Sequence, residues 1–380
     1  MRRAITAVIV TAATVTAAAP AGADPPTTGY ALVFSDEFNG TAPDTAKWNF
    51  RTDVKAGSAQ LARNVTVANG VMTINLKQEA VQGKNWTGGG LVSKRAFRYG
   101  YYETRAKIAT VGGWHTSFWL QAGNGTTTFP PEQRTEIDVL ENDSANQRTV
   151  HSGVITWKGS GVHGPISPGT TYDSGLDLRQ WHTYGVDWSE TSAKYYVDGV
   201  LRYTAPYSPS QWTHDYLNVW LTSIAYPESA SGPSVAQFDY VRYWQKDYYL
   251  DNDGPAAYGY SETGTWLDSA LAGWNYGSPS RYATCHAIGN TATWRPNLNT
   301  AGTYQVSVHK IAHSGSDPNG RYDVVHNGAT STTYVNGTNG ASGWVSLGTY
   351  SFPAGTSGYV KLTASGTGCA RADAVKFVRA

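Results

Sequence analysis

The chain has 380 residues, of which 40% are hydrophobic, and this is enough for two domains with cores of their own. The formal net charge is +1 and only 15% of the residues are charged, which argues against nucleic acid or an anionic membrane surface as a partner. The aromatic residues are 14 Trp and 25 Tyr against 9 Phe. Flat rings with a polar edge suit stacking on sugars, and they also suit packing between β-sheets.

The N-terminal residues 1–23 have the pattern of a secretory signal peptide. Arg2 and Arg3 supply the positive start, residues 4–19 form an apolar stretch, and residues 21–23 (Ala-Gly-Ala) form a small-residue cleavage site. No later segment approaches about 18 unbroken apolar residues, the length that a membrane helix needs. We therefore expect a secreted, extracellular and monomeric protein with no membrane partner. A retained N-terminal anchor is the alternative.

Residues 24–246 are predicted to form antiparallel β-structure. They contain short β-branched or aromatic runs separated by Gly, Asn, Asp and Pro, and Asp198-Gly199 between two such runs is a hairpin turn. Helical periodicity is absent from any long stretch, which argues against an α/β fold and favours a sandwich of antiparallel sheets. Representative runs are 64–76, 99–108, 183–188 and 194–201.

The run 135–141, Thr-Glu-Ile-Asp-Val-Leu-Glu, places three carboxylates within six residues. Side chains alternate across a strand, so Glu136 and Asp138 point to one face while Ile137 points to the other. Strict alternation would turn Glu141 to the apolar face, and a one-residue β-bulge is needed to return it beside the other two acids. We therefore expect a row of three acids above an apolar underside.

Three carboxylates crowded on one face suit the cleavage of glycosidic bonds. Like charges at short range raise the pKa of at least one member of such a group. A glycosidase needs this difference, because it works with one ionised carboxylate and, across the scissile bond, a carboxylic acid that keeps its proton. The alternative is an acidic edge strand whose carboxylates point into water.

Residues 247–380 form a second block, which begins with the turn-rich junction 251–255 and is rich in Gly, Ser and Thr. Its short strand-like runs are 302–310, 322–326, 345–352 and 359–363. We predict a second, smaller β-sandwich. In an oxidising compartment Cys285 and Cys369 are expected to form a disulfide that ties this block together, with two free buried thiols as the alternative.

Several ordered motifs in residues 30–246 resemble the family 16 glycoside hydrolases, and together they are far more specific than the acidic run alone. The motifs are 34–40 followed by Trp48, 90–94 followed by 99–105, Trp114 with 118–120, and 238–242. The resemblance implies an all-β fold: a concanavalin-like β-jelly-roll sandwich whose concave face forms an open cleft, followed by the smaller β-sandwich.

The resemblance also implies roles for the three acids. Glu136 matches the nucleophile, Glu141 matches the acid/base, and Asp138 matches the carboxylate that assists them. The inserted Leu140 matches the bulged branch of the family, which includes laminarinases and agarases. A retaining enzyme of this kind holds its two working carboxyl groups roughly 5–5.5 Å apart and forms a glycosyl-enzyme intermediate. Asp138 is expected to hydrogen-bond Glu136 and, as a charge, to keep Glu141 protonated.

Trp114 and Trp119 resemble the rings that line the sugar-binding subsites of the family. Their spacing of five residues places them on opposite faces of a regular strand, so only one faces the cleft unless the strand bulges. Trp220 is a further candidate for sugar binding, with core packing as its alternative. His115 stands where many relatives have a proline; we count it among the candidate substrate contacts, with a plain surface histidine as the alternative.

Asp239 resembles a ligand of the structural calcium that some family members carry, and a carboxylate that caps the closing strand is the alternative. We expect no required cofactor, since the carboxylate mechanism needs none. Residues 247–380 resemble the golvesin-type domain that is also attached to xanthan lyases. The residues that carry this second resemblance are 291–296, 302–304, 343–350 and 372–377. It implies a non-catalytic β-sandwich that binds polysaccharide or serves as a spacer.

The predicted function is that of a secreted, endo-acting, retaining glycoside hydrolase with a β-linked polysaccharide as substrate. Many relatives of the bulged branch place a histidine near the position of Thr156, with His151 upstream in this chain, so the identity of the sugar stays open. A β-1,3-glucan is ranked first, and an agar-type or other β-galactan is ranked close behind. A cell-wall glucan transglycosylase and a sugar-binding protein without hydrolysis are the alternatives.

Overall fold

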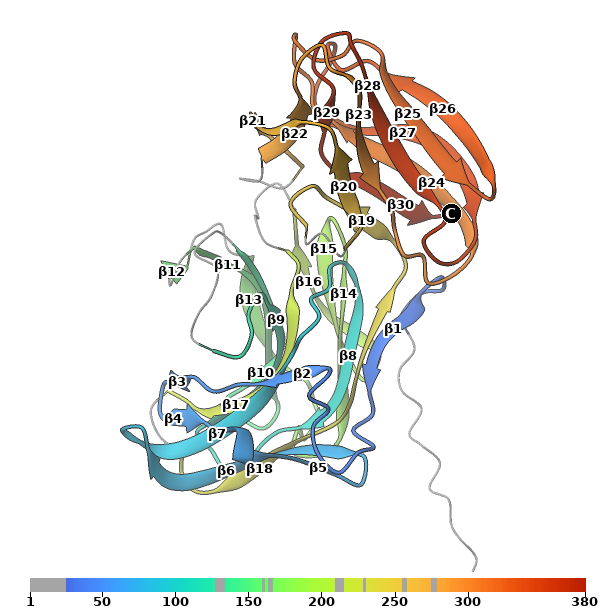
Figure 1. Ribbon diagram of the computed structural model, residues 1–380. Coiled ribbons are helices and arrows are strands. Elements are labelled where there is room, and N and C mark those ends of the chain that lie inside the picture. The colour runs from blue at the N-terminus through green and yellow to red at the C-terminus, as the bar shows by residue number, and fades with distance from the viewer. Residues whose placement is uncertain are drawn as a thin grey trace, which may run out of the picture.

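The structure is a computed structural model that describes residues 25–126, 134–158, 161–162, 167–208, 215–227, 230–254, 258–274 and 279–380 (Figure 1). The predicted signal peptide, residues 1–23, lies outside the described residues. Apart from the short 3₁₀ helix η1 (Ala62–Asn64), every regular element in these ranges is a β-strand. The prediction of an all-β fold is therefore confirmed. The described segments contain no helix long and apolar enough to span a membrane.

Two antiparallel sheets face each other in the N-terminal part of the chain and form the predicted jelly-roll sandwich. The strands of the first sheet are β1 (Ala31–Asp36), β5 (Val65–Ala68), β6 (Val71–Val81), β8 (Gly100–Lys107), β14 (His182–Trp188), β15 (Ser192–Val197), β16 (Val200–Pro206) and β18 (Ser234–Gln245). The strands of the second sheet are β2 (Trp48–Phe50), β7 (Lys84–Ser93), β9 (Trp114–Gln121), β10 (Arg134–Asn142), β11 (Thr149–Lys158), β12 (Gly161–Val162), β13 (Ser167–Asp173) and β17 (Asn218–Ala225). The short strands β3 (Val54–Lys55) and β4 (Ser58–Gln60) lie at the edge of β7.

The order of the second sheet places the acidic strand near its centre. The strands run β2-β7-β17-β9-β10-β11-β13, so β10 is flanked by β9 and β11. The core lies between this sheet and the first one, and the pattern of burial along the strands shows why. In β6, for example, Met72, Ile74 and Leu76 are buried while the residues between them are not, which is the period of two that a half-buried strand requires.

Glycine allows two strands of the second sheet to approach closely. A Cβ atom on Gly90 of β7 would lie 2.6 Å from the carbonyl oxygen of Leu221 in β17, and one on Gly88 would lie 2.3 Å from the carbonyl oxygen of Ser223. Any other residue at these positions would force the strands apart. The two glycines therefore keep β17, which carries Trp220, in close contact with β7.

The C-terminal part forms three smaller sheets around a core of its own. Their strands are β19 (Tyr248–Leu250), β30 (Val375–Arg379), β24 (Gly302–Lys310) and β27 (Gly343–Phe352); β20 (Tyr260–Thr263), β23 (Ile288–Trp294), β28 (Tyr359–Ser365), β25 (Gly320–His326) and β26 (Ala329–Val335); and β21 (Trp266–Ala272), β22 (Pro279–Ala283) and β29 (Arg371–Ala372). A disulfide joins Cys285 and Cys369 across 84 residues, as predicted. The expected boundary at residues 246 and 247 falls in the link between β18 and β19.

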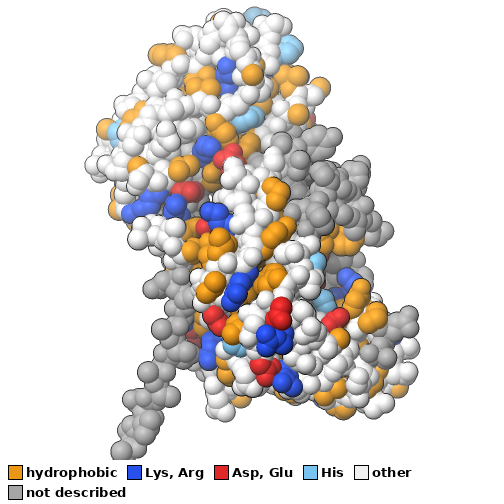
Figure 2. Space-filling view, turned by 180° about the vertical axis from the view of Figure 1, so that it is seen from behind, with side chains coloured by type: hydrophobic (Ala, Val, Ile, Leu, Met, Phe, Trp, Pro, Cys, Tyr) orange, Lys and Arg blue, Asp and Glu red, His pale blue; other side chains and the backbone are white. Residues whose placement is uncertain are grey.

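Seen from behind, the charged side chains on the described part of the surface gather in small groups of both signs (Figure 2).

The two parts of the molecule meet along a broad junction. In the interior of the junction Trp274 belongs to the same apolar core as Tyr99 and Tyr207 of the N-terminal part, so one core continues across the boundary. The ring of Trp274 also stacks on Tyr249 at 5.5 Å between centroids.

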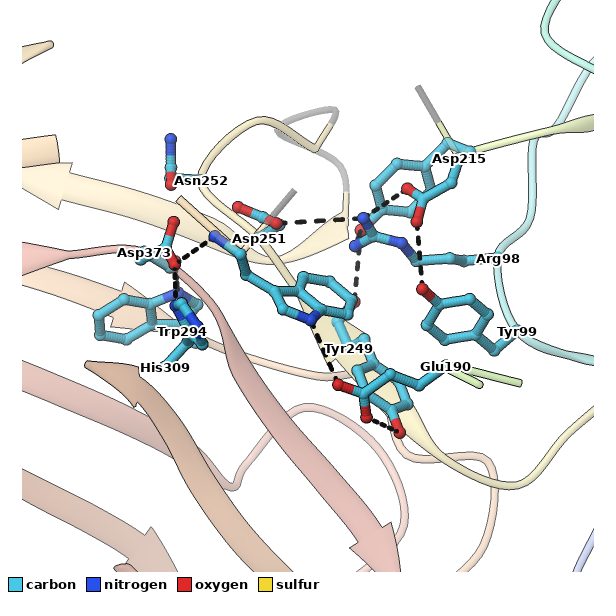
Figure 3. A network of polar contacts seen from close by, with 12 residues as sticks. Arg98, Tyr99, Glu190, Asp215, Tyr249, Asp251, Asn252, Trp294, His309 and Asp373 are labelled. Carbon is cyan, nitrogen blue, oxygen red and sulfur yellow. Dashed lines mark hydrogen bonds and ion pairs between the residues drawn. The ribbon is translucent and has the colours of Figure 1, made fainter. Parts of the chain in front are cut away.

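Glu190, in the turn between β14 and β15, contacts four segments of the C-terminal part, and Figure 3 shows its carboxylate beside Tyr249. Its carboxylate accepts hydrogen bonds from the indole N–H groups of Trp274 (3.2 Å) and Trp344 (2.6 Å). The same carboxylate accepts hydrogen bonds from Lys376 Nζ (2.9 Å) and the Tyr249 hydroxyl (3.2 Å). One acidic side chain of the first part thus satisfies donors from four positions that are far apart in the sequence.

Replacing Glu190 by Ala removes the acceptor of two indole N–H groups and the partner of Lys376. These donors stay within the junction, so the free energy of unfolding should fall by about 2–4 kcal/mol, the range for unpaired buried polar groups. Urea unfolding followed by Trp fluorescence measures this change. Glu79→Ala removes an exposed partner of Arg63 and is the control, which should barely move the unfolding midpoint. Equal, small effects in both variants would show that Glu190 does not hold the junction.

Candidate active site

Strand β10 (Arg134–Asn142) carries the three acids, and a β-bulge interrupts it at the predicted place. Asp138 and Leu140 pair with consecutive residues of β9, so Val139 has no partner on that side. The pairing with β11 also shifts between Asp138 and Glu141. The prediction of an extra residue between the second and third acids is therefore confirmed.

The bulge buries the apolar side chains and keeps the outer two acids together. Ile137, Val139 and Leu140 all lie in the core between the sheets, because the extra residue allows two consecutive apolar side chains to turn inward. Glu136 and Glu141 both line one cleft with a volume of about 400 Å³. Other residues that line this cleft are Lys55, His115, Trp119, His151, Trp157 and Tyr226.

Glu136 is held by a neighbour on the adjacent strand. Gln121 of β9 pairs with Glu136 across the two strands, and its side-chain amide donates a hydrogen bond to Glu136 Oε2. Burial raises the pKa of Glu136 to about 7, and the negative charge of Glu141 acts in the same direction. Glu136 therefore keeps its proton up to a higher pH than an exposed glutamate does.

The surroundings of Glu141 lower its pKa, in contrast to those of Glu136. His115 Nε2 lies 2.9 Å from Glu141 Oε1. Burial acts to raise the pKa of Glu141, but the hydrogen bond with His115 and the charges of His115 and His151 outweigh it and lower the pKa. The expectation that Glu141 keeps its proton in the free protein is therefore wrong, because an imidazole stands in contact with the carboxylate.

Asp138 lies in the same row and is only 1% exposed. Burial raises the pKa of Asp138 well above its ordinary value, and the charges of Glu141 and Glu136 add to this effect. A raised pKa favours the protonated form of Asp138, in which the carboxyl group can donate a hydrogen bond. This direction argues against the predicted role of Asp138 as a charge beside Glu141 and favours the predicted hydrogen bond to Glu136.

Trp119 is the tryptophan of β9 that faces the cleft. It lines the cleft, and its indole N–H donates a hydrogen bond to Thr222 Oγ1 at 3.1 Å. Trp220 stacks beneath it at 4.6 Å between ring centroids and is almost fully buried. The prediction that Trp220 contacts substrate directly is therefore wrong. Trp220 supports the ring of Trp119, and the guanidinium of Arg51 lies within 6 Å of both rings.

Trp114 lies in the core, contrary to the prediction that it binds sugar. It is fully buried, its indole N–H donates a hydrogen bond to the carbonyl oxygen of Gly232 at 2.8 Å, and its ring packs edge-on against Trp86. The reason is the regularity of β9, which pairs with β17 without any shift of register. A regular strand turns residues five positions apart to opposite faces, so Trp114 and Trp119 cannot both reach the cleft.

Asp239 does not fit a calcium ligand. Its carboxylate accepts a hydrogen bond from the guanidinium of Arg105 at 2.7 Å, and a cation in this position would be repelled by that guanidinium. Among the described residues, no group of three or more His, Cys, Asp or Glu side chains is placed to hold a metal ion. The structure therefore gives no support to the prediction of calcium at Asp239, because its carboxylate already has a positively charged partner.

Some residues around the acids were missed in the sequence. Gln121 hydrogen-bonds Glu136 and lies two residues after Trp119 on the same strand, so the alternation of a strand could have placed it on the same face as Trp119. Lys55 and Tyr226 come from segments remote from β10, and nothing in their local sequence connects them with the acids. His115 contacts the carboxylate of Glu141 and was considered only as a substrate contact or a surface side chain.

Two family models match the chain. One is described as "Beta-porphyranase A-D, GH16 domain" and matches residues 31–246, and the other is described as "Golvesin C-terminal domain" and matches residues 250–379. The kappa-carrageenase of Pseudoalteromonas carrageenovora is 30% identical over 257 residues, which are 56% of this chain and 63% of the relative. A β-glucanase of Rhodothermus marinus is 26% identical over 188 residues, 46% of this chain and 65% of the relative. The chain thus spans slightly less than two thirds of these curated relatives.

The chain was also matched with solved structures. The catalytic domain of an endo-1,3-β-glucanase (laminarinase) from Thermotoga petrophila has a TM-score of 0.49 and 22% identity, covering 57% of this chain and 98% of that one. Porphyranase B from Zobellia galactanivorans has a TM-score of 0.49 and 20% identity, covering 57% and 92%. The family model of residues 31–246 covers more than half of the chain. The chain therefore belongs to glycoside hydrolase family 16.

Proposed function

We propose that this chain is a secreted, endo-acting hydrolase that cleaves a β-linked polysaccharide with retention of configuration. The observation that carries the proposal is the placement of Glu136 and Glu141 in one cleft, on either side of the bulge in β10. Two glutamates that reach into the same cleft supply the nucleophile and the acid/base that a double displacement needs. Secretion rests on the sequence pattern of residues 1–23.

The contacts of Glu136 suit a nucleophile. In the first step its carboxylate attacks the anomeric carbon while Glu141 protonates the leaving oxygen, and the glycosidic bond breaks. Gln121 orients one carboxylate oxygen, and Asp138, whose raised pKa favours its protonated form, donates a hydrogen bond that stabilises the negative charge. In the second step Glu141 takes a proton from water, whose oxygen attacks the anomeric carbon and releases Glu136.

We place a β-galactan of the porphyran or carrageenan kind first among the substrates. The family model that matches is described as a β-porphyranase domain, and the relative with 30% identity is a kappa-carrageenase. Lys55, exposed on β3 and part of the cleft wall, adds a cation that favours a sugar with anionic substituents. The β-1,3-glucan that was ranked first from the sequence becomes the second candidate, supported by relatives named as β-glucanases.

We further propose that residues 24–246 form the catalytic part and residues 247–380 a non-catalytic accessory part. A second core, formed by residues of the C-terminal part alone, and the two family matches support this division. The junction around Glu190 favours a fixed orientation of the accessory part rather than attachment through a loose linker.

The purified protein is first screened for cleavage of porphyran, kappa-carrageenan, agarose, laminarin and lichenan. The polysaccharides that it degrades are then used to test the nucleophile. Glu136→Ala should abolish cleavage of any polysaccharide that is degraded, and azide should restore turnover of an activated aryl glycoside and give an α-glycosyl azide. Glu37→Ala is the control, because Glu37 pairs with Arg242 away from the cleft, and it should stay active. Full activity of Glu136→Ala would refute the nucleophile assignment, and cleavage of laminarin alone would reverse the order of substrates.

The raised pKa of Glu136 predicts a dependence on pH. Glu136 must be ionised to attack, so kcat/KM for an activated aryl glycoside should fall as the pH drops below about 7. Glu141→Gln removes the charge that, after burial, does most to raise this pKa, so the acid limb should move to lower pH by about one unit. An aryl group leaves without much protonation, so the variant keeps measurable activity. An acid limb that stays in place would show that Glu141 does not influence Glu136.

The two tryptophans of β9 should respond differently to truncation. Trp119→Ala removes a ring that faces substrate, so KM for the polysaccharide should rise by about tenfold, equivalent to roughly 1.4 kcal/mol of binding. Trp114→Ala leaves a cavity in the core and should lower the free energy of unfolding by about 3–5 kcal/mol while KM of the folded protein stays the same. Michaelis kinetics and urea unfolding measure both effects. The reverse pattern would place Trp114, and not Trp119, in the cleft.

A further inference from the structure

The double displacement needs a proton on Glu141, but the contact with His115 favours the charged form of this carboxylate. His115 Nε2 lies 2.9 Å from Glu141 Oε1. Burial would raise the pKa of Glu141, yet the hydrogen bond and the charge of the imidazole outweigh burial. An ionised carboxylate cannot act as the acid, so its immediate surroundings have to supply the proton.

The register of β9 places His115 beside Glu141. His115, Ser117 and Trp119 are alternate residues of a regular strand, and all three line the cleft. Ser117 pairs with Glu141 on β10, so His115 lies two residues along the same face from that pair. The side chain of His115 is 20% exposed, and its ring lies 5.4 Å from the ring of Tyr226, which also lines the cleft. The imidazole therefore stands beside the carboxylate in the same cleft.

We propose that His115 is a positioning residue that stores the proton which Glu141 delivers, so that imidazole and carboxylate form one acid/base pair. This inference rests on the proposed function, because it assigns a source to the proton of the same reaction. In the resting pair the proton lies on His115 and Glu141 is ionised. Movement of the proton along the hydrogen bond gives a neutral imidazole and a protonated Glu141 without changing the total charge of the pair.

The protons balance over both steps of the reaction. In the first step the bond between the anomeric carbon and the leaving oxygen breaks, Glu136 bonds to the carbon, and the leaving oxygen takes the proton from Glu141. The pair then consists of neutral His115 and ionised Glu141. In the second step the oxygen of water bonds to the carbon, the bond to Glu136 breaks, and the proton of water passes to Glu141 and then to His115.

Other charged groups face the pair from the neighbouring strands, but His115 makes the direct contact. Lys55 on β3 and His151 on β11 both favour the ionised form of Glu141. Lys55 is exposed, and His151 directs Nδ1 to the hydroxyl of Thr171 at 3.0 Å. The remaining titratable or charged groups around the pair are Arg51, Glu136, Asp138, Asp143 and Tyr226.

The test is the pH profile of kcat/KM for the polysaccharide in His115→Gln. Glutamine keeps an N–H group beside Glu141 but cannot carry the proton, so the carboxyl group alone must hold it. An ordinary carboxyl group loses its proton about two pH units below an imidazole, so the alkaline limb should move to lower pH by roughly 1–2 units. Activated aryl glycosides, which leave without protonation, should lose less than threefold in kcat.

His151→Gln is the matched control, because His151 lines the same cleft and is the cross-strand partner of Glu141, but its Nδ1 contacts the hydroxyl of Thr171. The alkaline limb of this variant should move far less than in His115→Gln, whatever happens to KM. An alkaline limb that is unchanged in His115→Gln, or that moves equally in both variants, overturns the proposal. A uniform loss of kcat at every pH in His115→Gln, with the limb in place, also overturns it, since that pattern indicates a purely structural role.

A second measurement does not depend on turnover. The ¹³C signal of the Glu141 carboxyl group, followed by NMR in the unaltered protein and in His115→Phe, should titrate at a higher pH in the variant by about one unit, because phenylalanine removes the hydrogen bond and the charge. An unchanged midpoint overturns the pairing. A raised midpoint in a protein that cleaves no glycoside would support the pair and contradict the proposed function, so the two failures can be distinguished.

Discussion

The site depends on one extra residue in β10. The core requires Ile137, Val139 and Leu140 to turn inward, and a regular strand could bury only two of them. The bulge at Val139 allows all three to be buried and at the same time returns Glu141 to the face of Glu136. The burial of apolar side chains and the alignment of the two glutamates are thus consequences of the same distortion. A strand without the bulge would direct Glu141 into the space between the sheets.

The neighbouring strand β9 determines how the acids behave. Gln121 and His115 stand at opposite ends of the same face of β9, one beside Glu136 and the other beside Glu141. Because the amide is neutral and the imidazole can be charged, the two glutamates differ in pKa although they share a strand. In the free protein Glu136, the proposed nucleophile, has the raised pKa, and Glu141, the proposed acid, has the lowered pKa. This is the opposite of what the two roles require. A proton held by His115 reconciles the two, since the pair as a whole remains an acid.

The junction between the two parts of the chain is as tightly organised as the cleft. Trp274 enters the core of the N-terminal part, and Glu190 binds donors from four separate segments of the C-terminal part, of which Figure 3 labels Tyr249. On the other side of Trp274, the buried guanidinium of Arg98 pairs with Asp215 and lies 4.0 Å from Asp251. A surface with this much buried polar contact favours a single orientation. Polysaccharide bound by the accessory part would then lie at a fixed distance from the cleft.

The sequence alone determined the all-β fold, the position of the bulge and the row of acids, because strand period and residue spacing are local properties. It also indicated the disulfide, because the chain has only two cysteines. It could not decide which tryptophan of β9 faces the cleft, since this strand is buried on both faces and hydrophobicity marks neither side. Nor could it predict the charge states of the acids, which depend on His115, Gln121 and Lys55 from other strands. It also could not predict the ion pair of Asp239 with Arg105, which is 134 residues away in the sequence. Charges and ring contacts are settled between segments that only the folded chain brings together, and electrostatic energies depend on those distances and not on order along the chain.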